Sequence, residues 1–112
     1  MARSSTNRIT SFVAPASVAR SASRALRWRR TKQAGTRVGW TRANQLAKRR
    51  PVSLKTIKRM NAYFDRHAVD SLAIGWLKDE PGWPSKGRIM WEAWGGSAGR
   101  KWAERILETN GK

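Results

Sequence analysis

Arginine side chains recur at helical spacing near the start of the chain. The row consists of Arg20, Arg24, Arg27 and Arg30. Pro15 can open a helix and Gly35 can stop it, so we expect a helix from Pro15 to about Gln33 that carries this row on one face. Like charges at these spacings disfavour an isolated helix. We therefore expect the row to contact phosphate groups, and a basic helix that faces only water is the alternative.

Trp28 lies inside this arginine row. Aromatic rings set between cations suit the stacking of unpaired bases, so Trp28 is the best stacking candidate among the seven tryptophans. Five of the seven lie in residues 65–112, away from most of the cations. We expect those five to form the core, because large rings supply buried area to a small domain.

A second group of cations follows helix signals between residues 41 and 67. Thr41 can cap a helix from Arg42 to Arg50, which Pro51 ends because the residue before a proline avoids the α region. Ser53 can cap another helix from Leu54 to about His67. The spacing predicts two opposite faces on this helix. The apolar face would hold Ile57, Met60, Phe64 and Ala68, and the cationic face would hold Lys55, Lys58, Arg59 and Arg66.

The sequence from Ala47 to Met60 resembles the helix-turn-helix of the lac-repressor type. The matching positions are Ala47, Val52, Ser53, Thr56, Ile57 and Met60. In that family the second helix enters the major groove and its early residues read base edges. The resemblance therefore implies groove contacts, here assigned to Ser53, Leu54, Lys55, Thr56 and Lys58. We expect Arg59, on the same cationic face, to contact the groove as well.

Pro51 departs from this pattern, since the family usually places glycine in the turn. Proline fixes φ near −65°, whereas that turn tends to need a positive φ. We therefore expect an altered turn or a wider helix-loop-helix. Three flanking cations, Arg42, Arg49 and Arg50, would then neutralise phosphate. The alternative is a serine-capped amphipathic helix of an ordinary small helical domain.

The net charge is +17 over 112 residues and is unevenly placed. Residues 1–64 contain 16 Lys or Arg and no acid, whereas residues 65–112 contain 8 Lys or Arg and all 7 acids. Self-repulsion at this density destabilises a compact state, so the composition indicates a polyanionic partner. Nucleic acid is the first candidate. Structured RNA and an acidic protein stay open, whereas the basic segments lack the apolar faces that a membrane surface needs.

Chemistry other than binding finds little support in the residues. The chain has no cysteine, so disulfides and thiolate metal sites are excluded. His67 is the one histidine, and with Asp65 and Asp70 it could hold a divalent ion. These two acids share a helical face poorly, so we expect a structural histidine. We expect no enzymatic activity, no cofactor and no metal. No apolar run in the sequence approaches the ~20 residues that a membrane span needs.

The remaining turn and cap signals complete the outline. Residues 35–39, GTRVG, lie between two glycines and predict a loop, after which Trp40 could pack against the start of the next helix. Ser85 can cap a helix from Lys86 to about Trp94, which Gly95 and Gly96 end. Ser97 can cap a last helix to about Glu108. The apolar positions of these two helices are Ile89, Met90, Ala93, Trp94, Trp102, Ala103, Ile106 and Leu107.

The chain from about Gly35 to Leu107 resembles a small domain encoded in bacteriophage genomes. The shared pattern includes Val38-Gly39, Gln45-Leu46, Thr56-Ile57, Arg59-Met60, Arg66-His67, Trp94-Gly95-Gly96 and Trp102-Ala103-Glu104-Arg105. The resemblance implies a phage origin, and hence the host bacterial cytoplasm during infection or the virion. It implies no activity.

Together these observations predict an all-α protein with a helix-turn-helix-like pair. Residues 1–14 would be a disordered basic arm and residues 15–112 a single helical domain. We expect a DNA-binding protein whose main partner is double-stranded DNA. The competing expectation is a virion or host-takeover protein that docks on an acidic protein partner.

Overall fold

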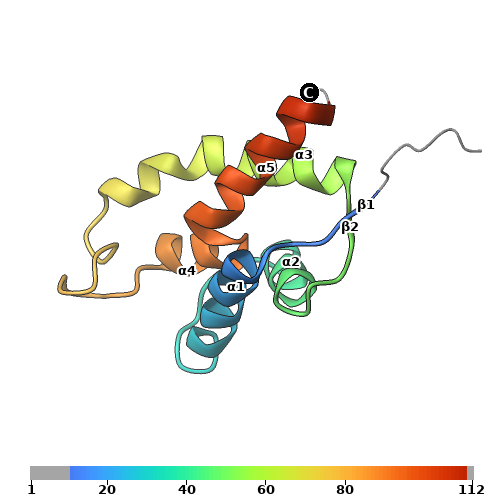
Figure 1. The fold of residues 1–112 in the computed structure, drawn as a ribbon. Helices are drawn as coiled ribbons and strands as arrows, with labels where there is room; N and C mark the ends of the chain where they lie inside the picture. The colour runs from blue at the N-terminus through green and yellow to red at the C-terminus, as the bar shows by residue number, and fades with distance from the viewer. Residues whose placement is uncertain (1–10, 111–112) are drawn as a thin grey trace, which may run out of the picture.

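The structure, a computed structural model, describes residues 11–110 and confirms a small all-α fold (Figure 1). Five α-helices, one 3-10 helix and one two-stranded sheet make up these residues. In chain order they are β1 (Ser11–Phe12), α1 (Ala16–Trp28), α2 (Arg37–Ala47), β2 (Val52–Ser53), α3 (Leu54–His67), the 3-10 helix η1 (Ala68–Leu72), α4 (Lys86–Ala93) and α5 (Gly96–Asn110).

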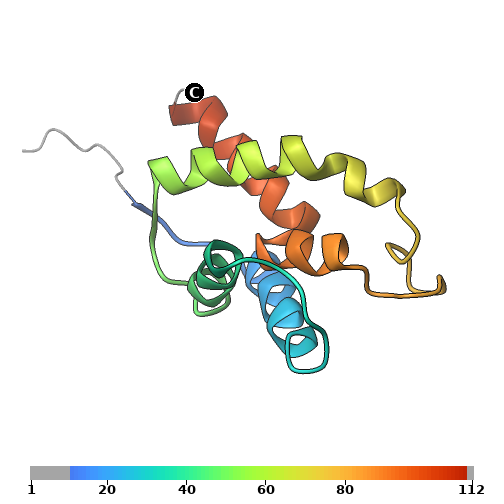
Figure 2. The same cartoon turned by 180° about the vertical axis from the view of Figure 1, so that it is seen from behind.

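Two groups of packed helices organise the described residues. Helix α1 packs against α2 and α4, and α3 packs against α5. Helix α5 also contacts α1, so it joins the two groups. Figure 2 shows α3 crossing α5, with α1 and α2 gathered below them.

Apolar side chains from every α-helix meet in one core. The largest fully buried side chains are Val18, Leu46, Val52, Ile57, Met60, Phe64 and Ile89. Burial of each such side chain contributes about 1.5–3 kcal/mol. Of the five tryptophans expected in the core, Trp76, Trp91, Trp94 and Trp102 are buried, whereas Trp83 is half-buried.

Two helices begin where their serine caps predict. The Ser53 hydroxyl accepts a hydrogen bond from the Thr56 amide at 3.1 Å, and α3 runs over the expected range to His67. The Ser85 hydroxyl accepts from the Arg88 amide at 3.0 Å at the start of α4. The apolar stripe of α3 is buried as expected, with Ala68 partly buried and Tyr63 added to it. The capping prediction at Ser97 is wrong, because α5 already begins at Gly96.

The prediction of a loop at residues 35–39 is wrong, and so is the cap at Thr41. The Thr36 hydroxyl accepts a hydrogen bond from the Gly39 amide at 3.1 Å, and α2 begins at Arg37. Glycine normally weakens a helix interior, yet a Cβ at Gly39 would lie 2.6 Å from Met90 Sδ. Close packing therefore accounts for this glycine, not a turn. Trp40 lies inside the helix, where its indole N–H donates to the Ala34 carbonyl at 3.0 Å.

Helix α1 is shorter than predicted and ends at Trp28. The amides of Arg30 and Thr31 bond to carbonyls three residues back, at 3.2 and 3.1 Å. Such tightened turns end an α-helix. They redirect the chain toward α2 before it reaches Gly35.

The connection from α2 to α3 spans residues 48–53, and Pro51 does not end the first helix. Helix α2 ends at Ala47, and Arg49 adopts a left-handed conformation with φ of 52°. The Arg49 amide bonds to the Leu46 carbonyl and the Arg50 amide to the Gln45 carbonyl, both at 3.0 Å. These are the two bonds of a Schellman C-cap. The wider connection expected from Pro51 is present, and Arg49 supplies the positive φ.

The segment just before α1 belongs to the fold, so the predicted arm boundary at residue 14 is wrong. Strand β1 pairs antiparallel with β2, with Ser11 opposite Ser53 and Phe12 opposite Val52. Ala14 is fully buried. Backbone pairing of two short strands and burial of an apolar side chain order residues that composition alone marks as irregular. Residues 1–10 of the predicted arm lie outside the described residues.

Candidate nucleic-acid interface

The exposed side of α3 carries the predicted groove residues. Lys55, Lys58 and Arg59 are exposed, whereas Ile57 is fully buried on the opposite side. Ser53 is exposed and Thr56 is half-buried, and their hydroxyls bond to each other at 3.1 Å. The cap therefore already engages both hydroxyls, while the three cations are free to meet a ligand.

No acid in residues 11–110 forms an ion pair with these three cations. The ion pairs in this part of the chain involve Arg24, Arg88, Arg100 and His67. Asp65, the nearest acid along α3, lies 3.4 Å from Arg100 of α5. The N-terminal half of α3 therefore carries an uncompensated positive field.

Arg42 cannot serve as the predicted phosphate contact. Only 8% of Arg42 is exposed, its guanidinium bonds to the Gln45 side chain, and it lies 5.4 Å from the centroid of the Trp94 ring. Burial lowers the pKa of Arg42, and the nearby charge of Arg59 lowers the pKa further. The cation–π contact with Trp94 and the hydrogen bond to Gln45 hold this residue inside. Arg42 therefore stabilises the fold.

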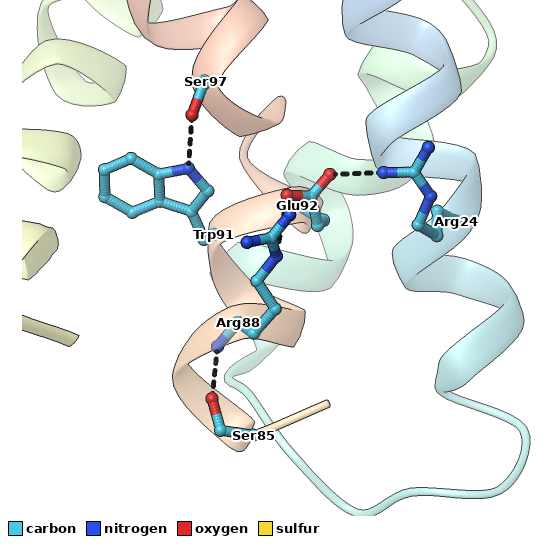
Figure 3. Close-up of polar contacts among 6 residues, drawn as sticks. All are labelled: Arg24, Ser85, Arg88, Trp91, Glu92 and Ser97. Atoms are coloured by element: carbon cyan, nitrogen blue, oxygen red, sulfur yellow. Dashed lines mark hydrogen bonds and ion pairs between the residues drawn. The ribbon is translucent and has the colours of Figure 1, made fainter. Parts of the chain in front are cut away.

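Arg24 is partly withdrawn from the arginine row by a buried carboxylate (Figure 3). Glu92 of α4 is 3% exposed, and its Oε1 accepts from Arg24 Nη1 at 3.1 Å. Arg88 Nε lies 3.2 Å from the other oxygen, Oε2. Removal of a carboxylate from water is costly unless cations pair with it. This pairing ties α1 to α4 and leaves 45% of the Arg24 side chain exposed.

The other members of the arginine row are exposed as expected. Arg20, Arg27 and Arg30 all reach solvent. Trp28 is half-buried, and its ring packs edge-to-face on Trp83 with 5.4 Å between ring centroids. The stacking role predicted for Trp28 therefore competes with a packing role that the fold already gives it.

The two cations of the α2–α3 connection differ in their surroundings. Arg49 Nε donates to the carbonyl of Ala14 at 2.7 Å, which fastens the connection to the segment that enters α1. Arg50 is exposed. Both remain close to the start of α3, and Arg50 is the freer of the two.

Two further cations lie near this interface and escaped the sequence prediction of site residues. Arg66 continues the exposed side of α3 beyond Arg59. It lines a groove between α3 and α4, and Lys86 of α4 lines the same groove. Helical spacing places Arg66 on the cationic face of this helix, but the residue is not among the predicted contacts. Lys86 is brought there only by tertiary packing, so no local signal could have found it.

Metal and membrane sites find no geometric support in the described residues. No group of three or more potential metal ligands occurs among residues 11–110. His67 Nδ1 lies 3.1 Å from Asp70 Oδ2, while Asp65 contacts Arg100. No helix within these residues has the length and apolar character needed to cross a membrane.

Comparison with protein-family models, with curated proteins and with solved structures finds no match to this chain. The resemblances of residues 47–60 and 35–107 therefore stay predictions. The structure adds one feature to the first. Helix α2 packs on α1 and α4 whereas α3 packs on α5, so the two helices are anchored on different partners.

Proposed function

We propose that this chain is a phage-encoded protein that binds double-stranded DNA through the exposed cationic side of α3. The observation that carries the proposal is the cluster Lys55, Lys58 and Arg59, exposed and without an acidic partner in the described residues. Neutralisation of phosphates by such cations releases counterions and supplies affinity. A helix of this width also fits the major groove.

The remaining exposed arginines would hold the DNA backbone. Arg20 and Arg27 of α1, Arg30 in the turn after α1 and Arg50 beside α3 reach solvent. Contacts of this kind position a protein on DNA and carry no sequence information by themselves. Base contacts would come from α3, where Lys55, Lys58 and Arg59 can donate to guanine edges. The polar atoms of Ser53 and Thr56 serve the helix cap, so we assign them no base contact.

A charge-reversal experiment tests this proposal. Lys55→Glu with Arg59→Glu lowers the net charge from +17 to +13, and so does the matched control Lys78→Glu with Lys101→Glu, whose two lysines are exposed on other elements. Fluorescence anisotropy with duplex DNA across a salt series would give affinity at ~0.2 M salt and the slope of log K against log salt. Circular dichroism would confirm that both variants remain helical.

We expect the α3 variant to lose most duplex binding and to reduce the salt slope by about 2, because each phosphate contact contributes about 0.9. The control should lose far less. Equal losses in the two variants would show that the charge is a non-specific tether and would overturn the role of α3. Single-stranded DNA and structured RNA, measured alongside, decide which nucleic acid is preferred.

A second candidate function, docking on an acidic protein, rests on a separate observation. Four large apolar side chains are exposed in η1 and in the segment that follows it, namely Val69, Leu72, Ile74 and Leu77. Grouped apolar side chains of this kind are typical of protein contacts. Leu72→Ser with Ile74→Ser should release an acidic partner that survives nuclease and high salt, and it should leave duplex affinity unchanged.

A further inference from the structure

A groove of about 520 Å³ lies between α3 and the N-terminal ends of α2 and α4. Its lining combines apolar side chains such as Val38 and Met90 with the charged side chains of Arg59, Arg66, Asp70 and Lys86. Sites for small molecules typically occupy 300–1,000 Å³ and combine apolar walls with a few polar groups. The groove fits this description, and Lys55 and Lys58 lie outside it.

Three cations line the groove against a single acid. Arg59 and Arg66 come from α3 and Lys86 from the first turn of α4. Asp70 is the acid, and its carboxylate already contacts His67 at 3.1 Å. The charge of the lining therefore favours an anion.

Backbone amides add to this preference. Thr36 and Ser85 cap α2 and α4, and each hydroxyl accepts from one amide only, that of Gly39 or of Arg88. Neither helix has an acid in its first turn. The first amides of a helix lack intrahelical partners, and together with the helix dipole they attract phosphate. Both first turns border the groove through Val38 and Gly87.

A buried hydroxyl without a partner gives an independent sign of a ligand. Tyr63 is 5% exposed and lines the groove, and its hydroxyl has no hydrogen-bond partner in the described residues. A buried hydroxyl that stays unsatisfied destabilises the free protein. Burial, and then the charge of Asp70, raise the pKa of Tyr63, whereas the charge of Arg66 lowers it. The hydroxyl is closed to solvent in the free protein, so a ligand must open it before a polar edge of that ligand can satisfy it.

The aromatic and apolar lining suits a flat ring. Tyr63 stacks between Trp94, at 4.7 Å between ring centroids, and His67, at 4.5 Å. His67 forms the outer end of this stack, with 42% of its side chain exposed. Val38, Ala62 and Met90 supply apolar wall. Planar rings bind well to such surfaces.

We propose that this groove binds a nucleotide, with the phosphate held by Arg59, Arg66 and Lys86 and the base set against the apolar wall beside Tyr63. The ligand is either a free nucleoside phosphate or an unpaired nucleotide of a nucleic-acid strand. This site shares Arg59 with the cationic side of α3, whereas Arg66 and Lys86 are assigned to the groove alone. Binding of one nucleotide in the groove is a different chemistry from binding of a duplex along α3.

Isothermal titration calorimetry of the full chain at ~0.2 M salt tests the site, because this salt suppresses general anion binding. The probes are the four nucleoside monophosphates, adenosine and inorganic phosphate. We expect at least one nucleotide to bind tenfold or more tightly than either part alone. Nucleotides that bind no better than inorganic phosphate would overturn the proposal.

Two variants locate the site. Ala62 is exposed and lines the groove, so Ala62→Phe should fold normally and block the nucleotide. Tyr63→Phe keeps the ring stack and should weaken the nucleotide by about fivefold, the value of one hydrogen bond, while inorganic phosphate binding stays unchanged. Nucleotide binding that survives Ala62→Phe would place the site elsewhere and refute the proposal.

Oligonucleotides then identify the source of the nucleotide. A single strand that competes with the free nucleotide and binds more tightly would indicate an unpaired nucleotide within a strand, whereas weaker competition would indicate a free nucleotide. The variant Lys55→Glu with Lys58→Glu lies outside the groove and should impair duplex binding only. Ala62→Phe should impair nucleotide binding only, so the two proposals can fail separately.

Discussion

Arg49 offers a quantitative test of how the α2–α3 connection is held. This residue occupies the left-handed C′ position of the Schellman cap, with φ of 52°, where glycine is the usual residue. Its Nε also donates to the Ala14 carbonyl at 2.7 Å. The backbone strain and the hydrogen bond act in opposite directions. Substitution by alanine and by glycine separates the two.

The two effects are similar in size. The left-handed conformation costs an L-residue roughly 1–2 kcal/mol and glycine nearly nothing. The hydrogen bond contributes about 1 kcal/mol, at the lower end for a charged donor because Arg49 is exposed. Arg49→Ala loses the bond and keeps the strain, so it should lower the free energy of unfolding by about 1 kcal/mol. Arg49→Gly loses both, so it should lie within about 1 kcal/mol of the unsubstituted protein.

Thermal unfolding followed by circular dichroism measures this difference. For a domain near 100 residues, 1 kcal/mol shifts Tm by roughly 4–8 °C. We expect the glycine variant to melt that much above the alanine variant. Lys48→Ala, at an exposed neighbour with ordinary φ of −86°, should change Tm little. A glycine variant that melts at or below the alanine variant would refute the assignment of strain to Arg49.

Three further predictions follow from the packing. Glu92→Ala should lower the free energy of unfolding by about 2–3 kcal/mol. This is less than the loss of a fully buried ion pair would cost, because the Arg24 side chain is 45% exposed. Chemical denaturation would measure the change, and Arg24→Ala should lower the free energy of unfolding less than Glu92→Ala does. Ile57→Asp should unfold the domain, since Ile57 is 0% exposed and an unpaired charge would be buried; an unchanged melting curve would contradict the face assigned to α3. Burial, and then the charge of Asp70, raise the pKa of Tyr63 above its ordinary value of 10.0, so the folded state holds the phenol proton longer than the unfolded state and stability should fall as pH rises above about 10. Tyr63 is the only tyrosine, so a tyrosinate absorbance titration reports on it directly, and an ordinary midpoint in the folded protein would show that the hydroxyl is accessible.

The parts of the fold that sequence predicts well are those with local causes. Helix α3 begins at its serine cap and carries one apolar and one cationic side, which follow from hydrogen bonding at Ser53 and from helical periodicity. Helix α4 follows Ser85 in the same way. The exposure of Lys55, Lys58 and Arg59 is therefore predictable, because the buried side of α3 fixes where they point.

The errors arise where a distant residue decides the local conformation. Gly39 has the composition of a loop, yet Met90 occupies the space that a Cβ would need and makes glycine suitable for a helix. Arg42 has the position of a phosphate contact, yet Trp94 and Gln45 draw it inside. In each case the partner comes from tertiary packing or from a side-chain contact that spacing does not reveal.

The same distinction separates the two binding surfaces proposed for this protein. The cationic side of α3 needs only one helix, so it is visible in the sequence, and its charge alone can attract any polyanion. The groove needs three helices to converge, and it joins Lys86 of α4 and the amides of α2 to Arg66 of α3. The groove can add selectivity for an unpaired base that phosphate contacts alone do not supply, because phosphate contacts do not distinguish one sequence from another. Tyr63, whose hydroxyl has no hydrogen-bond partner in the described residues, lines the groove. We therefore expect discrimination among nucleotides to depend on Tyr63 more than on any exposed lysine.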